Sequence, residues 1–329
     1  MIKFFRNSYL VQYVAIALLL VALWVPSFVT GNVDPAWRSP VTPLYNVVAN
    51  IFDFWAPSML IIAMVLMGFE AVFFNSILVS NQVIGRVNTL GAVTFLLMMN
   101  LVPTQTTFYP FLLSSVFLLM LIHTMFAIYQ TPRPELYLFN AGLFLSLATM
   151  FWFPTLLLAL WIVVALSIVH KSSLRLHLIP FIGLLFPYFI YFTIHFLKGD
   201  LLTVWQAYGD YFGNFRLTTQ GFGWLKIALM GFMALTLFIP MLMPKFYSLE
   251  KTIAVRSKIA MTYNLLLGGI LMLFFEGDPM LSGVFFVALS ILFSYYMAWL
   301  DHVKWANITF VILLLGVLAM HYVPLFVWR

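Results

Sequence analysis

The sequence predicts an all-helical integral membrane protein, a single polytopic bundle of about eleven transmembrane helices over residues 1–329. Of the 329 residues, 64% are apolar and 8% are charged, whereas about a quarter of the residues in a soluble domain are charged. The apolar residues form runs of about twenty, the length of helix that crosses a bilayer. These runs do not alternate as barrel strands do, and helices satisfy their backbone within lipid.

The first apolar run follows Lys3 and Arg6, and no signal-peptide cleavage site comes after it, so we expect an uncleaved span. The expected spans are residues 9–30, 55–79, 84–102, 109–130, 136–152, 154–170, 178–197, 224–244, 259–275, 281–299 and 306–327. Around Pro154 two short stretches meet. They form either a tight hairpin or one kinked helix, and the sequence leaves both open.

The distribution of basic residues favours a cytoplasmic N-terminus. In this orientation eleven Lys and Arg residues lie on the cytoplasmic side and five on the outer side. Residues 170–177 and 245–258 then form basic cytoplasmic turns, attracted to anionic membrane lipids. Basic residues are spread over many loops rather than clustered on one face, which argues against nucleic-acid binding. The chain has no cysteine, which excludes disulfides, thiolate metal sites and cysteine nucleophiles.

Two outer segments are longer than turns, residues 31–54 and 199–223. In the first, residues 44–53 have the pattern of an amphipathic helix lying on the membrane surface. The aromatic residues of the second suit the membrane interface. Because binding and catalysis concentrate in loops, we expect the functional site there. The sequence has no glycine-rich phosphate loop, HExxH or GxSxG motif, so it predicts no metal site and no certain cofactor.

Glu70 is the acidic residue that lies well inside an expected span. A charged carboxylate facing lipid costs at least a few kcal/mol, so this side chain should face the bundle interior. His123 in the 109–130 span lies at a similar expected depth and is the candidate partner. The pair predicts either a proton or ion relay or an interhelical hydrogen bond that fixes packing.

Asp34 and Arg38 lie just after the first span. Asp34 is the candidate catalytic base at the outer membrane face, and Arg38, together with Arg216 from the second long segment, is the candidate group that binds a lipid phosphate. The alternative is an Asp-Pro turn beside a solvated arginine. The sequence does not establish whether the two outer segments meet.

The middle of the chain, about residues 85–198, contains several small motifs in a distinctive order. They are Gly85-Arg86, Asn100-Leu101-Val102-Pro103, Phe108-Tyr109-Pro110, a Pro-Arg-Pro turn at 132–134, the run beginning Ala141-Gly142-Leu143 and ending Leu147-Ala148, Pro154, and Pro187-Tyr188. This order resembles the middle helices of the polytopic C-type glycosyltransferase superfold. The chain also resembles uncharacterised multi-pass proteins of bacterial inner membranes.

Members of that superfold transfer a sugar from a polyprenyl-phosphate carrier and have an acidic catalytic residue, often one of a pair, in the first outer loop. The resemblance therefore implies a glycosyltransferase of the cell envelope in the bacterial inner membrane, with Asp34 as base and a polyprenyl-phosphate-linked sugar as substrate. Two alternatives stay open: a non-catalytic scaffold that binds other envelope proteins, and a proton-coupled transporter that uses Glu70 and His123.

Overall fold

The computed structural model describes residues 2–7, 9–30, 39, 41–52, 56–85, 88–101, 106–131, 133–169, 173–214, 253–273, 282–299 and 303–327. Across these ranges the chain forms helices and turns, without strands. The helices are α1 (Ile2–Phe5), α2 (Leu10–Thr30), α3 (Pro43–Phe52), α4 (Ala56–Ser80), α5 (Leu90–Met99), α6 (Pro110–Ala127), α7 (Glu135–Phe151), α8 (Leu158–Ile168), α9 (Leu174–Lys198), α10 (Leu201–Asn214), α13 (Ile253–Leu273), α14 (Ser282–Trp299) and α15 (Val303–Val327). Two short 3₁₀ helices are η3 (Ile128–Gln130) and η4 (Phe153–Leu157).

Five segments of these helices are long and apolar enough to cross a membrane, and they indicate a membrane protein. They are Leu10–Thr30, Pro57–Ser80, Pro110–Ala127, Leu174–Lys198 and Lys304–Tyr322. Four apolar stretches are shorter: Leu90–Met99, Glu135–Phe151, Phe153–Ile168 and Gly283–Trp299. Ten of the eleven expected spans overlap these or other described helices, and the expected span 224–244 lies outside the described residues. The all-helical fold is confirmed, while eleven membrane crossings stay a prediction.

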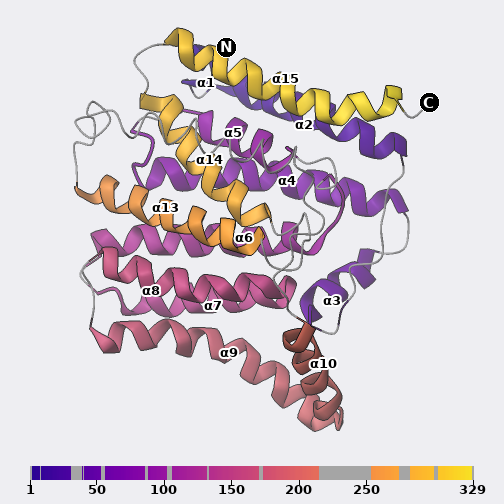
Figure 1. Cartoon of the computed structure of the whole chain (residues 1–329), viewed down its shortest axis with the longest axis vertical. Coiled ribbons are helices and arrows are strands. Elements are labelled where there is room, and N and C mark those ends of the chain that lie inside the picture. Colours follow the sequence, from indigo (N-terminus) through magenta and orange to yellow (C-terminus); the bar gives the residue numbers. More distant parts are fainter. Residues whose placement is uncertain are drawn as a thin grey trace.

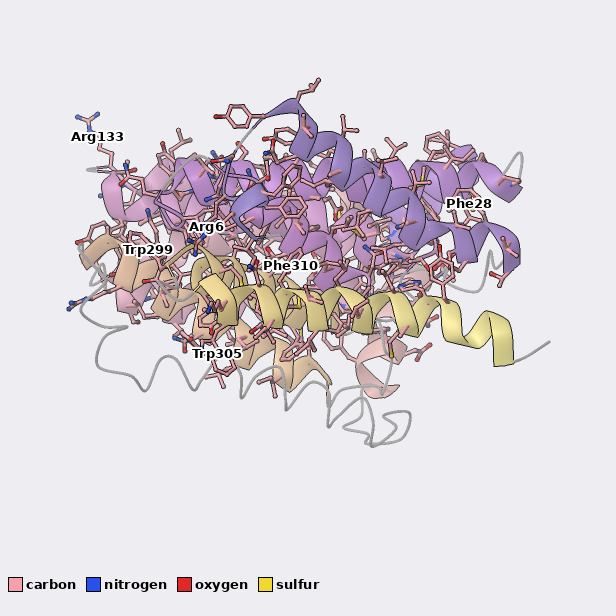
Figure 2. The ribbon with its side chains drawn as sticks, turned by 90° about the horizontal axis from the view of Figure 1, so that it is seen from above. Arg6, Phe28, Arg133, Trp299, Trp305 and Phe310 are labelled. Carbon is pink, nitrogen blue, oxygen red and sulfur yellow. The ribbon has the colours of Figure 1, made fainter. Side chains whose placement is uncertain are left out.

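The long helices lie side by side across the molecule (Figure 1). α7 packs between α6 and α9, while α13 packs against α8 and α14, and α14 packs against α5. The N-terminal α1 packs against the beginning of α15, so the first and last described helices are neighbours in the fold. Figure 2 shows Arg6, Phe310 and Trp299 where these elements come together. The Arg6 guanidinium donates to the Met297 carbonyl oxygen at 2.9 Å.

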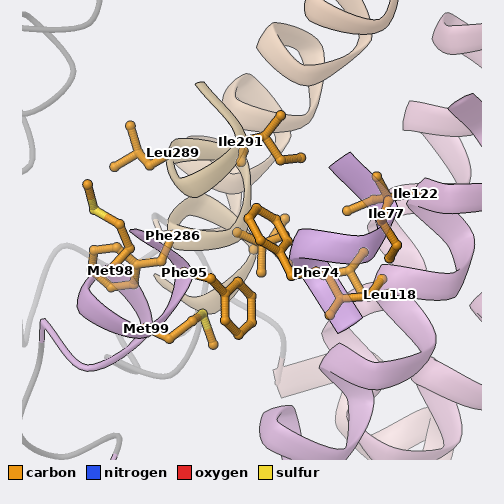
Figure 3. Packing of buried hydrophobic residues seen from close by; sticks show 14 of the residues in the cluster. Phe74, Ile77, Phe95, Met98, Met99, Leu118, Ile122, Phe286, Leu289 and Ile291 are labelled. Carbon is orange, nitrogen blue, oxygen red and sulfur yellow. The ribbon is translucent and has the colours of Figure 1, made fainter. Parts of the chain in front are cut away.

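The core lies where α4, α5, α6 and α14 meet (Figure 3). The rings of Phe74 on α4 and Phe95 on α5 have centroids 4.8 Å apart, and every residue of α5 is buried. α5 is shorter than the expected span of residues 84–102 because a turn after α4 uses part of it. In that turn Gln82 has a φ of 57°, and the amides of Val83 and Ile84 donate to the Leu78 carbonyl.

The chain makes a tight hairpin at Pro154, which resolves the alternative left open by the sequence. α7 ends at Phe151, and Trp152 has an extended backbone with φ −148° and ψ 103°. Pro154 then lies in the first turn of η4, a position where its missing N–H leaves no partner unsatisfied. α8 returns beside α7 (Figure 1).

α7 and α9 approach each other through two glycines. A Cβ atom at Gly142 would lie 1.8 Å from the carbonyl oxygen of Pro180, and one at Gly183 would lie 2.2 Å from the carbonyl oxygen of Phe139. The two backbones are therefore in direct contact, as in the small-residue interfaces of membrane helices.

Candidate functional site

The two long segments expected at the outer face, residues 31–54 and 199–223, both contribute to an apolar cluster, which we call the junction cluster. Its buried members are Val41 just before α3, Phe153 in the hairpin, and Val204 and Tyr208 on α10. α3 and α10 are neighbours at one end of the bundle (Figure 1), referred to below as the α3–α10 end. The sequence alone did not determine this meeting, because apolar contacts between distant loops leave no local pattern.

The sequence pattern does not predict α10, because its polar and aromatic residues are typical of an interfacial loop. Gly199 ends α9 in the left-handed conformation, with a φ of 79° that glycine adopts without strain. The His195 Nδ1 and Asp200 Oδ1 atoms lie 2.9 Å apart across this corner. The corner turns the chain directly into α10, which begins at Leu201.

Aromatic rings hold α10 against the hairpin. The Phe153 ring lies edge-on to those of Tyr208, Tyr211 and Phe212, with centroid separations of 5.4, 5.1 and 5.2 Å. The Tyr208 hydroxyl is buried, and no described residue forms a hydrogen bond with it. Burial, followed by the neighbouring Tyr188, raises the pKa of Tyr208, so its phenol stays neutral at physiological pH.

An apolar groove with a volume of about 120 Å³ opens between the hairpin and α10. Its lining residues are Phe153, Pro154, Leu156, Leu157, Leu160, Tyr211 and Phe212. Leu160 is 69% exposed, so the groove reaches the surface of the bundle beside the hairpin. A groove of this composition accepts a hydrocarbon chain rather than a polar solute.

The three residues expected to act at the outer face, Asp34, Arg38 and Arg216, all lie outside the described residues. Other residues of the same two segments are described, and they belong to the junction cluster. Val41 is in the first outer segment with Asp34 and Arg38, and Tyr208 is in the second with Arg216. Described residues of both segments therefore belong to one cluster, while the positions of Asp34, Arg38 and Arg216 stay a prediction.

Glu70 and His123 have different partners. Glu70 is fully buried, and its Oε1 atom lies 2.7 Å from the Ser115 hydroxyl oxygen on α6. Neither a hydrogen bond nor an ion pair joins Glu70 to His123 among these described side chains. Counted from the first residue of each helix, Glu70 lies about 21 Å along α4, but its partner Ser115 lies only about 8 Å along α6. The two helices start at different levels, which places His123 about 12 Å beyond Ser115.

His123 belongs to a second polar group at the other end of α4. The Asn81 amide nitrogen donates to the Ile77 carbonyl and contacts His123 Nδ1 at 3.0 Å. Nδ1 is then an acceptor, and the neutral ring carries its hydrogen on Nε2. Lys258, expected in a basic cytoplasmic turn, is instead 1% exposed and donates to the Asn81 carbonyl at 2.6 Å. Its ammonium thereby caps the C-terminus of α4.

Within the described ranges, no three His, Asp or Glu side chains come together as a metal ion requires. No family model, no curated protein sequence and no solved structure matches the chain. The site is therefore defined by its own residues: an apolar groove between the hairpin and α10, and separate polar groups inside the bundle.

Proposed function

We propose that this protein is a polyprenyl-phosphate-dependent glycosyltransferase of a bacterial inner membrane, with about eleven spans and a cytoplasmic N-terminus. The α3–α10 end then faces the outside of the cell membrane. The observation that carries the proposal is the apolar groove beside the junction cluster, because a long isoprenoid chain needs an apolar surface that opens to lipid.

The chemistry assigns separate roles to the expected residues. Asp34 is the general base that takes the proton from the acceptor hydroxyl as this oxygen attacks the sugar. Arg38 and Arg216 stabilise the carrier phosphate as it leaves with the bonding electron pair. The junction cluster supports this division, because Val41 and Tyr208 from the two segments share it with Phe153, which also lines the groove.

The direct test is native mass spectrometry of the purified protein with added polyprenyl phosphate. A tryptophan at Leu160 fills the groove, and a tryptophan at Leu315 is the matched control because Leu315 is an exposed leucine on α15. We expect Leu160→Trp to lower the bound fraction at least tenfold and Leu315→Trp to leave it unchanged. Equal binding by the two variants would exclude the groove as the carrier site.

The alternative functions give different results in the same preparation. A scaffold retains another envelope protein and no carrier lipid, so such a copurified complex would contradict the transferase. A proton-coupled transporter binds its solute without needing the groove, and Leu160→Trp would then leave uptake into liposomes intact.

A further inference from the structure

We infer that Glu70 is a proton-binding site within the bundle, where it is a neutral carboxylic acid that donates to Ser115. This inference is independent of the groove and of the proposed transferase. It rests on the hydrogen-bond geometry around the Ser115 hydroxyl and on the surroundings of the Glu70 carboxyl.

The Ser115 hydroxyl oxygen has two close neighbours. It lies 2.7 Å from Glu70 Oε1 and 2.7 Å from the carbonyl oxygen of Leu112. A hydroxyl group has one hydrogen and donates to one acceptor at a time. If Glu70 is ionised, one of these two short contacts joins two oxygens with no hydrogen between them. If Glu70 is protonated, its O–H donates to Ser115 and Ser115 donates to Leu112, so both contacts are hydrogen bonds.

Among the residues that the structure describes, no positive charge is paired with Glu70. Its second oxygen, Oε2, is buried and has no hydrogen-bond partner within the described part of the chain. The helices packed on α4 include α2, α3, α5 and α6. Their ionisable residues are Tyr13, Tyr45 and His123, with none on α5, and His123 is the neutral ring bound to Asn81. Burying an unpaired carboxylate costs several kcal/mol, whereas the neutral acid avoids most of this cost.

A second unpartnered group lies near the carboxyl. The Tyr109 hydroxyl is fully buried and has no hydrogen-bond partner among the described residues, and the charge of Glu70 would act electrostatically on it. A phenol carries no positive charge, so Tyr109 does not compensate a carboxylate as a lysine would. Loss of the proton would leave a charge between α4 and α6, so proton binding at Glu70 is coupled to the packing of these two helices.

Infrared spectroscopy in an ester-free detergent tests the inference on the full chain. At mildly alkaline pH the exposed carboxyls are ionised, so a C=O band of a neutral carboxylic acid reports a buried acid. We expect this band in the wild type, with a shift in heavy water. It should disappear in Glu70→Gln and persist in Glu135→Gln, a matched glutamate at the start of α7. A wild type without the band, or a band that persists in Glu70→Gln, would overturn the inference.

Ser115→Ala provides an independent measurement if Glu70→Gln does not fold. Removing the acceptor of the Glu70 proton should move the band to higher frequency, because a carboxyl whose O–H no longer donates absorbs there. An unchanged band in Ser115→Ala would show that the proton is not donated to Ser115, and would contradict the assignment.

Discussion

The direct contact between α7 and α9 predicts that Gly142→Ala destabilises the bundle. The new Cβ would lie 1.8 Å from the Pro180 carbonyl oxygen and 2.9 Å from the Leu184 amide nitrogen. Both are backbone atoms of a helix, so neither can rotate away. Cβ contacts below 3.0 Å are essentially never observed, so α9 must move by more than 1 Å at this point.

The cost follows from this displacement. Overpacking of a tight contact costs about 1–3 kcal/mol, and a gap of 0.5–1 Å loses about a quarter to a half of each dispersion contact beside it. Alanine recovers up to about 1 kcal/mol through its higher helix propensity. The expected net loss is about 2 kcal/mol, which corresponds to a fall in Tm on the order of 5 °C.

The matched control is Gly316→Ala on α15, where the new Cβ has no atom within 4 Å. This variant keeps the helix-propensity gain without the clash, so its Tm should stay equal or rise. The assay is thermal unfolding in detergent, followed by tryptophan fluorescence. Gly183→Ala should lower the Tm as Gly142→Ala does. The double variant should lose less stability than the sum of the two single losses, because both substitutions push α7 and α9 apart at the same contact. Equal Tm values for Gly142→Ala and Gly316→Ala would refute the direct backbone contact.

Three further predictions concern other sites. Asn81→Ala removes the amide that binds both Ile77 and His123. It should lower the unfolding free energy by about 1–2 kcal/mol, measured by chemical denaturation. An unchanged unfolding free energy would show that this polar group does not stabilise the bundle. Trp161→Phe loses the 2.9 Å indole hydrogen bond to the Met261 carbonyl and should lower the unfolding free energy by about 1 kcal/mol in the same measurement. An unchanged unfolding free energy would contradict that hydrogen bond. Asp34→Asn should leave Tm unchanged and abolish sugar transfer from the polyprenyl carrier, and full transfer by this variant would remove Asp34 from the mechanism.

The helices were predictable where a property of the local sequence defines them. The runs beginning at Leu10 and Ala56 are apolar for the length of a membrane span, and the structure has α2 and α4 within a residue or two of the predicted bounds. The amphipathic stretch 44–53 likewise appears as α3, Pro43–Phe52. α10 was not predicted, because its start depends on the left-handed Gly199 and its stability depends on rings in the hairpin.

The candidate site was predictable only in part. The sequence identified Glu70 as an interior carboxyl because an acid within an apolar run must avoid lipid. It did not identify Ser115, since a serine in an apolar helix carries no such signal. The similar expected depths of Glu70 and His123 predict that they pair. α4 and α6 do not start at the same level, so Glu70 contacts Ser115 instead.

The sequence by itself determined the class of protein: charge is scarce, and apolar runs of membrane length recur along the chain. The tertiary structure alone decided which helices pack together, that the chain turns back at Pro154, and that Val41 and Tyr208 belong to one apolar cluster. The physical reason is that a helix in lipid is apolar on every side. It therefore has no polar face to show which side meets a neighbour, and only close packing, such as that between Gly142 and Pro180, selects the partner.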